Sequence, residues 1–257
     1  MRVLLFLAAI ALASLTAAQQ AGAQGGPFLV DDAAVGAPGA AQVETVGRFS
    51  VNGARERVFS VRPGYTLDAL PLQLSLGVVR DGLSRGDDGP KRRFWGTALE
   101  PEAKLRLLDL DAHGRVGLAL KTGLSWRASQ QRAGASDEDE AAPFRRLESA
   151  FGLGIASFRL SEGLTVNLNA GVERDRLESR TQPLWGIGAG WTVLPETALG
   201  STRLIAEASG TDRGRAALQA GLRQTVFDDR VDLDLVVGRN LSDERATWLV
   251  FGLATRF

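Results

Sequence analysis

The stretch LTVNLNAGVE, residues Leu164–Glu173, decides the fold class. Its apolar side chains at 164, 166, 168, 170 and 172 alternate with polar or small ones at 165, 167, 169, 171 and 173. Successive side chains of a β-strand point to opposite faces, whereas a helix would scatter both sets around its circumference. The stretch is therefore predicted to form a strand with one apolar and one polar face.

The same alternation recurs from Val43 to the C-terminus, and turns or polar loops separate the runs. It predicts twelve strands, at 42–52, 55–62, 67–79, 96–109, 114–127, 145–160, 163–174, 183–194, 202–210, 215–227, 230–241 and 246–257. Ten strands remain an alternative, because the stretch 53–66 is the least periodic. Pro101 lies inside the fourth predicted strand and cannot donate to a ladder, so this strand starts later or carries a bulge.

The connections between these strands alternate in length. Short ones are predicted at 63–64, 111–114, 161–163, 194–200 and 228–229, and longer, highly charged ones at 80–95, 128–144 and 175–182. Short turns at one rim and long loops at the other are typical of outer-membrane β-barrels. An even number of strands places both chain ends at the short-turn, periplasmic rim.

The N-terminus carries an export pattern. Residues 1–23 contain one early cation, Arg2, then an apolar run to about Leu15 and an A-x-A site at 21–23. This pattern predicts a signal peptide that is cleaved after Ala23, because the apolar run is shorter than the ~20 residues of a membrane-spanning helix. The predicted organisation is a signal peptide at 1–23, an irregular periplasmic lead-in at 24–40 and a transmembrane β-barrel at 41–257.

Composition excludes several classes of protein. The 257 residues include 30 basic and 30 acidic side chains, so the formal net charge is zero and no nucleic-acid partner is indicated. There is no cysteine, which excludes disulfides and cysteine nucleophiles. A soluble β-sandwich would show the same alternation and is the main alternative fold. The export pattern argues against it, as do Trp95, Trp126 and Trp185, which share the apolar parity near the long-loop ends, where an interfacial aromatic girdle lies.

We therefore expect an all-β, closed antiparallel transmembrane β-barrel of about 12 strands, with outer-membrane lipid around it. The polar face of each strand would line the lumen. The predicted lumen-lining residues are Glu44, Arg48, Gln73, Glu102, Lys104, Arg106, Lys121, Glu148, Asn167, Asn169, Glu173, Arg203, Glu207, Gln219, Arg223, Asp232, Asp234 and Arg256. They could line a water-filled pore, or they could form a network that fills the lumen.

Five glycines are also predicted to face the lumen, at 152, 154, 186, 188 and 190. They would leave room along one wall, or they would mark packing by the lead-in segment or by an inward loop. The letters GIGAG at 186–190 resemble a dinucleotide loop, but the strand period continues through them without the helix that such a loop requires.

The sequence indicates no enzyme, metal site or cofactor. His113 is the only histidine, and it lies in a predicted turn at the periplasmic rim. A single imidazole makes a metal site improbable, and at that rim the histidine is misplaced for hydrolysis in the outer leaflet. An outer-membrane enzyme that uses carboxylates alone is the remaining enzymatic alternative.

The segment PFLVDDAAVGAPGAAQVE, Pro27–Glu44, resembles the mature N-terminus of the outer-membrane transporter family named for the meta-pathway of phenol degradation. Pro27, Asp31, Asp32 and Gly39 match the family's pattern, and Val30 replaces its usual threonine. LIAEASG at 204–210, LQAGLRQT at 218–225 and FGLATRF at 251–257 are similar to the family's last strands, whereas the region 80–100 departs from it. The resemblance implies a barrel that passes small solutes, with aromatic or hydrophobic compounds as candidates.

The chain ends in WLVFGLATRF, 248–257, which is predicted to be the strand that closes the barrel. Its terminal alternation also resembles the signal read by the barrel assembly machinery, with Phe257, Thr255, Leu253 and Phe251 as the signal residues. The expected function is an outer-membrane channel or transporter for small-molecule solutes. A closed barrel with a structural or surface-interaction role is the first alternative, and an enzyme is the second.

Overall fold

The computed structural model describes residues 27–52, 55–85, 92–133, 146–176, 179–197, 200–212, 216–241 and 246–257. The predicted signal peptide lies outside the described residues. None of the helices in the described residues is long and apolar enough to cross a membrane.

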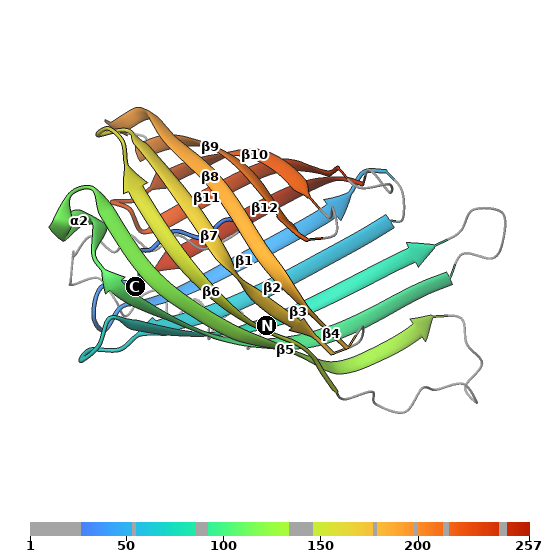
Figure 1. The fold of residues 1–257 in the computed structure, drawn as a ribbon. Coiled ribbons are helices and arrows are strands. Elements are labelled where there is room, and N and C mark those ends of the chain that lie inside the picture. Colours follow the sequence, from blue (N-terminus) through green and yellow to red (C-terminus); the bar gives the residue numbers. More distant parts are fainter. Residues whose placement is uncertain are drawn as a thin grey trace, which may run out of the picture.

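Twelve antiparallel strands form one closed barrel in which every strand pairs with its neighbours in sequence (Figure 1). This confirms the predicted fold class and favours twelve strands over ten. The strands are β1 (Ala41–Ser50), β2 (Arg55–Thr66), β3 (Leu72–Arg85), β4 (Arg92–Leu108), β5 (Val116–Ala133), β6 (Arg146–Arg159), β7 (Leu164–Asp175), β8 (Arg180–Thr197), β9 (Gly200–Thr211), β10 (Ala217–Val226), β11 (Val231–Asn240) and β12 (Thr247–Arg256).

The first and last strands close the barrel. β1 pairs with β12 in a register that runs from Gln42 opposite Arg256 to Ser50 opposite Trp248. Beyond this ladder, the N–H of Phe257 donates to the carbonyl of Ala41 at 2.8 Å, and the N–H of Ala41 donates to the carbonyl of Phe257 at 3.2 Å. The terminal residue therefore takes part in the seam.

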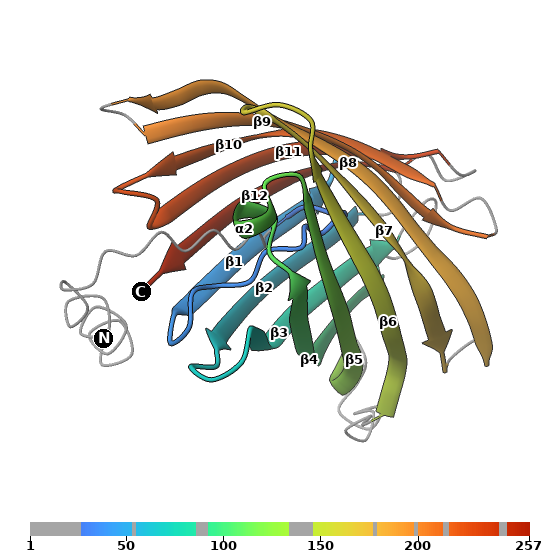
Figure 2. The ribbon, with the colours of Figure 1, turned by 60° about the vertical axis from the view of Figure 1, so that its left-hand side comes forward.

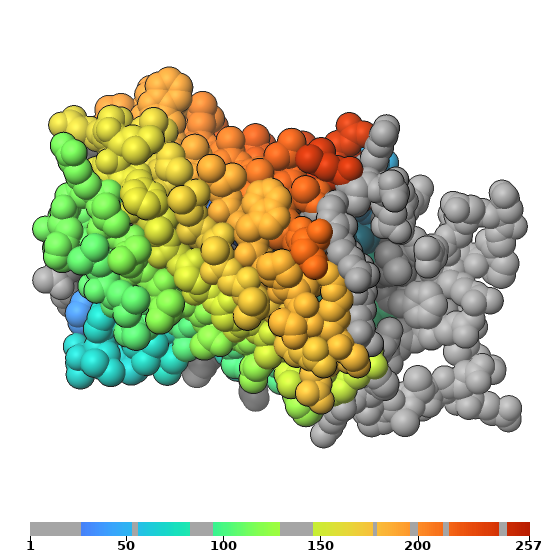
Figure 3. All heavy atoms as spheres, in the orientation of Figure 1, coloured from blue at the N-terminus to red at the C-terminus, as the bar shows by residue number. Residues whose placement is uncertain are grey.

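The two faces of the strands differ in exposure, as the alternation of apolar and polar residues predicts. In β10, Gln219 and Arg223 are buried inside, while Leu218 and Leu222 are exposed outside. Trp126 and Trp185 are both 42% exposed on the outer face. In Figure 3 the strands from β5 to β9 (green to orange) form a continuous outer surface.

Several predicted loop residues belong to strands. β3 continues to Arg85, β4 begins at Arg92 and β5 continues to Ala133, and their ladders extend over these charged stretches. The loops predicted at 80–95 and 128–144 are therefore too long. The charge at these positions predicts a loop, but a charged side chain can equally lie on a strand that has passed beyond the apolar zone.

Pro63 and Pro101 both lie within strands. The predicted turn at Pro63–Gly64 is wrong: β2 runs through it, and the connection to β3 follows at 67–71. The register is the same on both sides of Pro63, with Val61 opposite Val78 and Gly64 opposite Ser75. Pro101 likewise lies inside β4, and the β4–β5 register is the same before and after it. The missing proline N–H removes a hydrogen bond without displacing the strand.

A bulge corrects the predicted orientation of part of β6. Ser149 lies opposite Ser125, but Leu147 lies opposite Trp126, so Glu148 is an extra residue. Because the extra residue changes the parity of the strand, Ile155 and Ser157 point inward and are buried. The predicted inward glycines Gly152 and Gly154 point outward instead, and a Cβ on Gly152 would meet no atom within 4 Å.

At the short-turn rim, β4 connects to β5 through α2 (Leu110–His113). The side chain of Asp109 caps this helical turn by accepting a hydrogen bond from the Asp111 N–H at 2.9 Å. His113 is exposed here, at the rim where the sequence places it.

We predict that deleting Phe257 destabilises the barrel more than replacing Phe257 with alanine. Deletion removes both main-chain hydrogen bonds to Ala41, which together contribute about 1–3 kcal/mol, whereas Phe257→Ala retains them. Urea unfolding in detergent, followed by the gel shift between folded and unfolded forms, measures the difference. Equal stability of the two variants would show that the main-chain pairs at the seam contribute nothing.

Candidate functional site

The barrel interior contains the start of the described chain. Residues Pro27–Gly36, here called the internal segment, run inside the barrel before the chain reaches β1 (dark blue in Figure 2). Val30, Ala33 and Val35 of this segment are buried. The sequence predicts an irregular lead-in in the periplasm, whereas residues 27–36 of it lie within the lumen.

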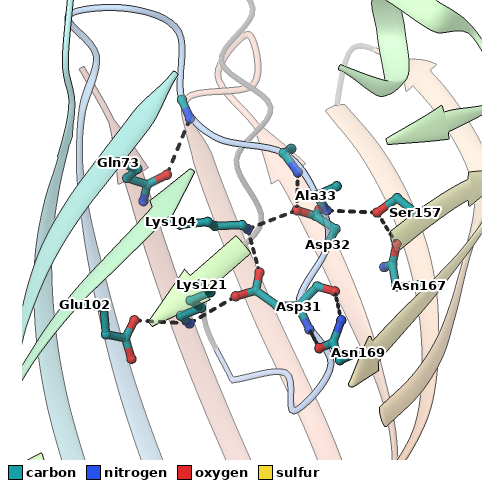
Figure 4. Close-up of polar contacts among 12 residues, drawn as sticks. Asp31, Asp32, Ala33, Gln73, Glu102, Lys104, Lys121, Ser157, Asn167 and Asn169 are labelled. Atoms are coloured by element: carbon teal, nitrogen blue, oxygen red, sulfur yellow. Dashed lines mark hydrogen bonds and ion pairs between the residues drawn. The ribbon is translucent and has the colours of Figure 1, made fainter. Parts of the chain in front are cut away.

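Asp31 anchors the segment to one wall (Figure 4). Its carboxylate accepts hydrogen bonds from Lys104 of β4 at 2.7 Å and from Lys121 of β5 at 3.0 Å. The Asp31 N–H donates to Oδ1 of Asn169 at 2.7 Å, and the Asn169 amide donates back to the Asp31 carbonyl at 2.8 Å. The buried charge is thus paired and hydrogen-bonded, which a charge removed from water requires.

The next residues extend this attachment along the lumen. The Ala33 N–H donates to the Ser157 hydroxyl at 2.8 Å, and this hydroxyl donates to Oδ1 of Asn167 at 2.8 Å. Asp32 accepts a hydrogen bond from the Ala34 N–H at 3.0 Å and lies 3.5 Å from the Lys104 ammonium. Side chains from β4 to β7 therefore hold residues 31–33.

The opposite wall binds residues 27–30. Leu29 donates its N–H to Glu207 of β9 at 2.8 Å, and Gln219 of β10 donates to the Pro27 carbonyl at 3.3 Å. The Arg223 guanidinium lies 5.0 Å from the centre of the Phe28 ring, a cation–π distance. The segment therefore spans the barrel from one wall to the other.

Two inward glycines of β8 make room for the segment. A Cβ on Gly186 would lie 3.0 Å from the Val30 side chain, and a Cβ on Gly188 would lie 3.2 Å from it. Of the alternatives that the sequence left open for these glycines, the structure favours packing by the lead-in. Gly190, the third, lies against the Arg203 side chain instead.

The two aspartates of the segment have opposite electrostatic character. Burial raises the pKa of Asp31, but the Lys104 and Lys121 ammonium groups outweigh this and hold the pKa well below its usual value. Burial also raises the pKa of Asp32, and here it prevails over the nearby Lys104 and Arg203 charges, while the Asp31 charge adds to the increase. Ionised Asp31 therefore stabilises the folded state at neutral pH, whereas ionised Asp32 costs stability.

A cavity of about 240 Å³ lies between the internal segment and the wall of β1 to β7. Charged side chains of both signs line it, and these are Asp31, Glu44, Arg62, Glu102, Lys104 and Lys121. Arg62 pairs with Glu100 at 2.7 Å and also with Glu102, which lies 3.1 Å from Lys121. Phe28, Val46, Phe151 and Leu153 add apolar surface.

The wall of β10 to β12 is closed by ion pairs. Arg223 binds Asp234 through two hydrogen bonds of 2.8 and 3.0 Å, and their side chains are 3% and 0% exposed. Asp232 pairs with Arg223 at 3.3 Å and also with Arg256. Bidentate arginine–carboxylate geometry fixes these side chains against one another, so this wall is filled by protein.

The other predicted lumen residues also lie on the inner face. Arg48 stacks 4.5 Å from the Trp248 ring, and Arg106 pairs with Asp109 at 2.8 Å. The remaining contacts are Gln73 with the Gly36 N–H at 3.4 Å, Glu148 with Arg127 at 3.0 Å, Glu173 with Gln182 at 2.9 Å, and Glu44 with Gln42 at 2.9 Å. A role of these residues in transport remains a prediction.

Sequence reasoning missed part of this site. Arg62 lies in the least periodic strand, and Ser157 follows the β6 bulge that reversed the expected parity. Asp31 and Asp32 lie outside every strand, so the period of two could not place them. Their signal was two adjacent acids within a segment otherwise composed of apolar and small residues. Across the described ranges, no three histidine or acidic side chains gather to hold a metal ion.

We predict that Asp31→Asn lowers the unfolding free energy at pH 7 by about 1–3 kcal/mol, because two charge-assisted hydrogen bonds are lost. Asp32→Asn is the matched control: it should cost less or raise stability, because burial outweighs the nearby cations at Asp32 and disfavours its charged form. Urea unfolding in detergent measures both. An equal loss in the two variants would contradict the assignment of Asp31 as the anchor. The Asp31 contribution should disappear only as the pH falls through its lowered pKa.

The barrel is similar to solved structures of outer-membrane barrels. One is the COG4313 outer membrane channel from Pseudomonas putida F1, at 14% identity and a TM-score of 0.56, covering 87% of this chain and 97% of that chain. Another is the transport unit of the autotransporter AIDA-I from Escherichia coli, at 12% identity and a TM-score of 0.57, covering 97% of this chain and 96% of that chain. At such identities the likeness shows the fold alone.

No curated protein matches the chain. The family described as "Uncharacterised conserved protein UCP029691" matches residues 11–257. This match covers nearly the whole sequence, and the chain therefore belongs to that family.

Proposed function

We propose that this protein is an outer-membrane channel for small solutes, and that the internal segment narrows its lumen. The observation that carries the proposal is the charged cavity of about 240 Å³ beside the segment, within a closed barrel. An inner wall with charged groups of both signs and space beside them offers a hydrated route. The ion pairs of β10 to β12 would confine that route to the β1–β7 side.

The membrane location is part of the proposal. The outer face carries exposed apolar side chains on every strand except β1 and β6, as a lipid-facing band requires. Export through the predicted signal peptide would bring the chain to the envelope. The outward Leu253 and Phe251 and the terminal Phe257 would serve as the signal for the barrel assembly machinery.

The cavity lining suggests the class of solute. Its volume is below the ~300–1,000 Å³ of sites for drug-sized ligands, which limits a bound solute to a small molecule. Arg62 and Lys121 would attract an anionic group, and Phe28 and Phe151 would contact an apolar part. Small aromatic acids fit this combination, and they agree with the resemblance to the phenol-pathway transporter family.

A closed barrel is the competing function, and the internal segment favours it. The segment bonds to both walls, so it could seal the lumen permanently. The barrel would then serve as a scaffold for the loops at its long-loop rim. Conductance with and without the segment separates the two functions.

We predict that the folded wild-type protein in planar lipid bilayers gives small, discrete conductance steps. A variant that lacks residues 27–36 should give steps several-fold larger, because the segment no longer fills the lumen. The gel shift on heating verifies that both proteins are folded barrels. Silence of both proteins at all voltages would exclude the channel, and equal steps would exclude the segment as the constriction.

We predict the orientation of the barrel from single cysteines, which are unambiguous because the chain has none. Asp212 follows β9 at the long-loop rim, and His113 lies in α2 at the other rim. In intact cells, a membrane-impermeant maleimide should label Asp212→Cys and should leave His113→Cys unlabelled. Labelling of His113→Cys before cell lysis would reverse the proposed orientation.

A further inference from the structure

Four strands share a feature of their outer faces that solute passage does not explain. On each, a run of outward apolar side chains starts at the turn rim and ends in an arginine on the loop side. Read in that direction, the runs are Tyr65, Pro63, Val61, Phe59 and Arg57 in β2; Leu72, Leu74, Leu76, Val78 and Arg80 in β3; Leu164, Val166, Leu168, Ala170, Val172 and Arg174 in β7; and Val231, Leu233, Leu235, Val237 and Arg239 in β11.

These arginines lie at one boundary of the apolar band. Five alternate positions span about nine residues of a tilted strand, which corresponds to the ~25 Å height of a lipid-facing band. Among the outward strand residues whose side chains the structure describes, there are arginines at this boundary and no acidic residue. The outer surface is therefore positively charged at the loop-side edge of the band.

On the inner face, several arginines form ion pairs with carboxylates of the protein. Arg62, Arg127 and Arg223 each pair with two carboxylates that lie one or two strands away along the inner wall. Within the described part of the chain, no carboxylate lies within 4 Å of the guanidinium of Arg57 or Arg80. A cation beside hydrocarbon without a counter-charge is costly, and an anion outside the protein would lower that cost.

Arg57 and Arg80 form the best-defined pair. Phe59 lies opposite Arg80, and Arg57 lies opposite Gly82, so the two arginines are diagonal neighbours on β2 and β3. Arg80 donates to the Thr97 hydroxyl at 2.7 Å, and its guanidinium lies 5.5 Å from the centre of the Trp95 ring. Trp95 covers Gly82, where a Cβ would lie 2.6 Å from its ring. Arg80 is thereby oriented, while Arg57 is exposed beside it.

We propose that Arg57 and Arg80 bind a phosphate group of a lipid in the leaflet on the loop side, and that Arg174 and Arg239 make weaker contacts of the same kind. Guanidinium groups match the geometry of phosphate oxygens. The tryptophan beside the pair belongs at the level of the head groups. The proposal rests on the barrel being inserted in a membrane, but not on solute transport.

The test uses the full-length folded protein in detergent micelles. Native mass spectrometry measures the binding of diphosphorylated lipid A, with dephosphorylated lipid A of the same acyl chains as the comparison lipid. The wild type should prefer the phosphorylated lipid. The double variant Arg57→Gln/Arg80→Gln should bind it about tenfold more weakly, since a hydrogen bond to a charged group contributes about that factor.

Two control variants test whether binding depends on the position of the arginines and on their guanidinium groups. Arg115→Gln removes an exposed arginine at the turn rim and should leave binding unchanged. Arg57→Lys/Arg80→Lys keeps the charge but loses the planar fork, so its affinity should lie between wild type and the glutamine variant. The gel shift on heating checks that every variant is folded.

Two outcomes would overturn the proposal: equal affinity of the glutamine variant and wild type, or equal affinity of both lipids for the wild type. Competition by millimolar inorganic phosphate would also overturn it, because the site would then bind the free ion and not a lipid. Channel conductance of the glutamine variant, measured separately, should equal that of wild type. Failure of the lipid site and failure of the channel are therefore distinguishable results.

Discussion

A polypeptide surrounded by hydrocarbon has no water to bind its N–H and C=O groups, so each of them needs a partner within the protein. The β1–β12 ladder and the main-chain pair between Ala41 and Phe257 meet this constraint, because they remove the last free sheet edges. The alternation of side chains follows from closure. Once the sheet is closed, each strand has one face toward the surroundings and one toward the interior.

The interior then has to accommodate many polar side chains in little space. Along β10 to β12 they neutralise one another, as Arg223 does with Asp232 and Asp234. On the β4–β7 side they bind the internal segment instead, and Asp31 provides the charge that Lys104 and Lys121 need. Burial of paired charges contributes little net stability, but removing one partner is costly. The segment is therefore integral to the wall that it contacts.

The alternation of apolar and polar side chains predicted the class of fold and most residues of the inner face. This was possible because the alternation depends only on neighbouring residues in the sequence. It placed Asn167, Asn169 and Asp234 correctly on one side of their strands without knowledge of their partners. The prediction failed in β6, where the extra residue Glu148 reverses which side chains face inward. It also failed at Pro63, where the proline suggests a turn but the strand continues. It could not reveal that Asp31 enters the barrel, because that depends on contacts with residues far away in the sequence.

The internal segment also has a consequence for the order of events during folding. Leu29 contacts Glu207 across 178 positions, and Gln219 reaches Pro27 across 192 positions. These contacts cannot form until the late strands have been made, although residues 27–36 precede every strand. Contacts of such long sequence separation form slowly. A closed barrel is still open at its ends, so the segment can enter before or after β12 meets β1. Its docking is thus a late step of folding, although its residues come first in the chain.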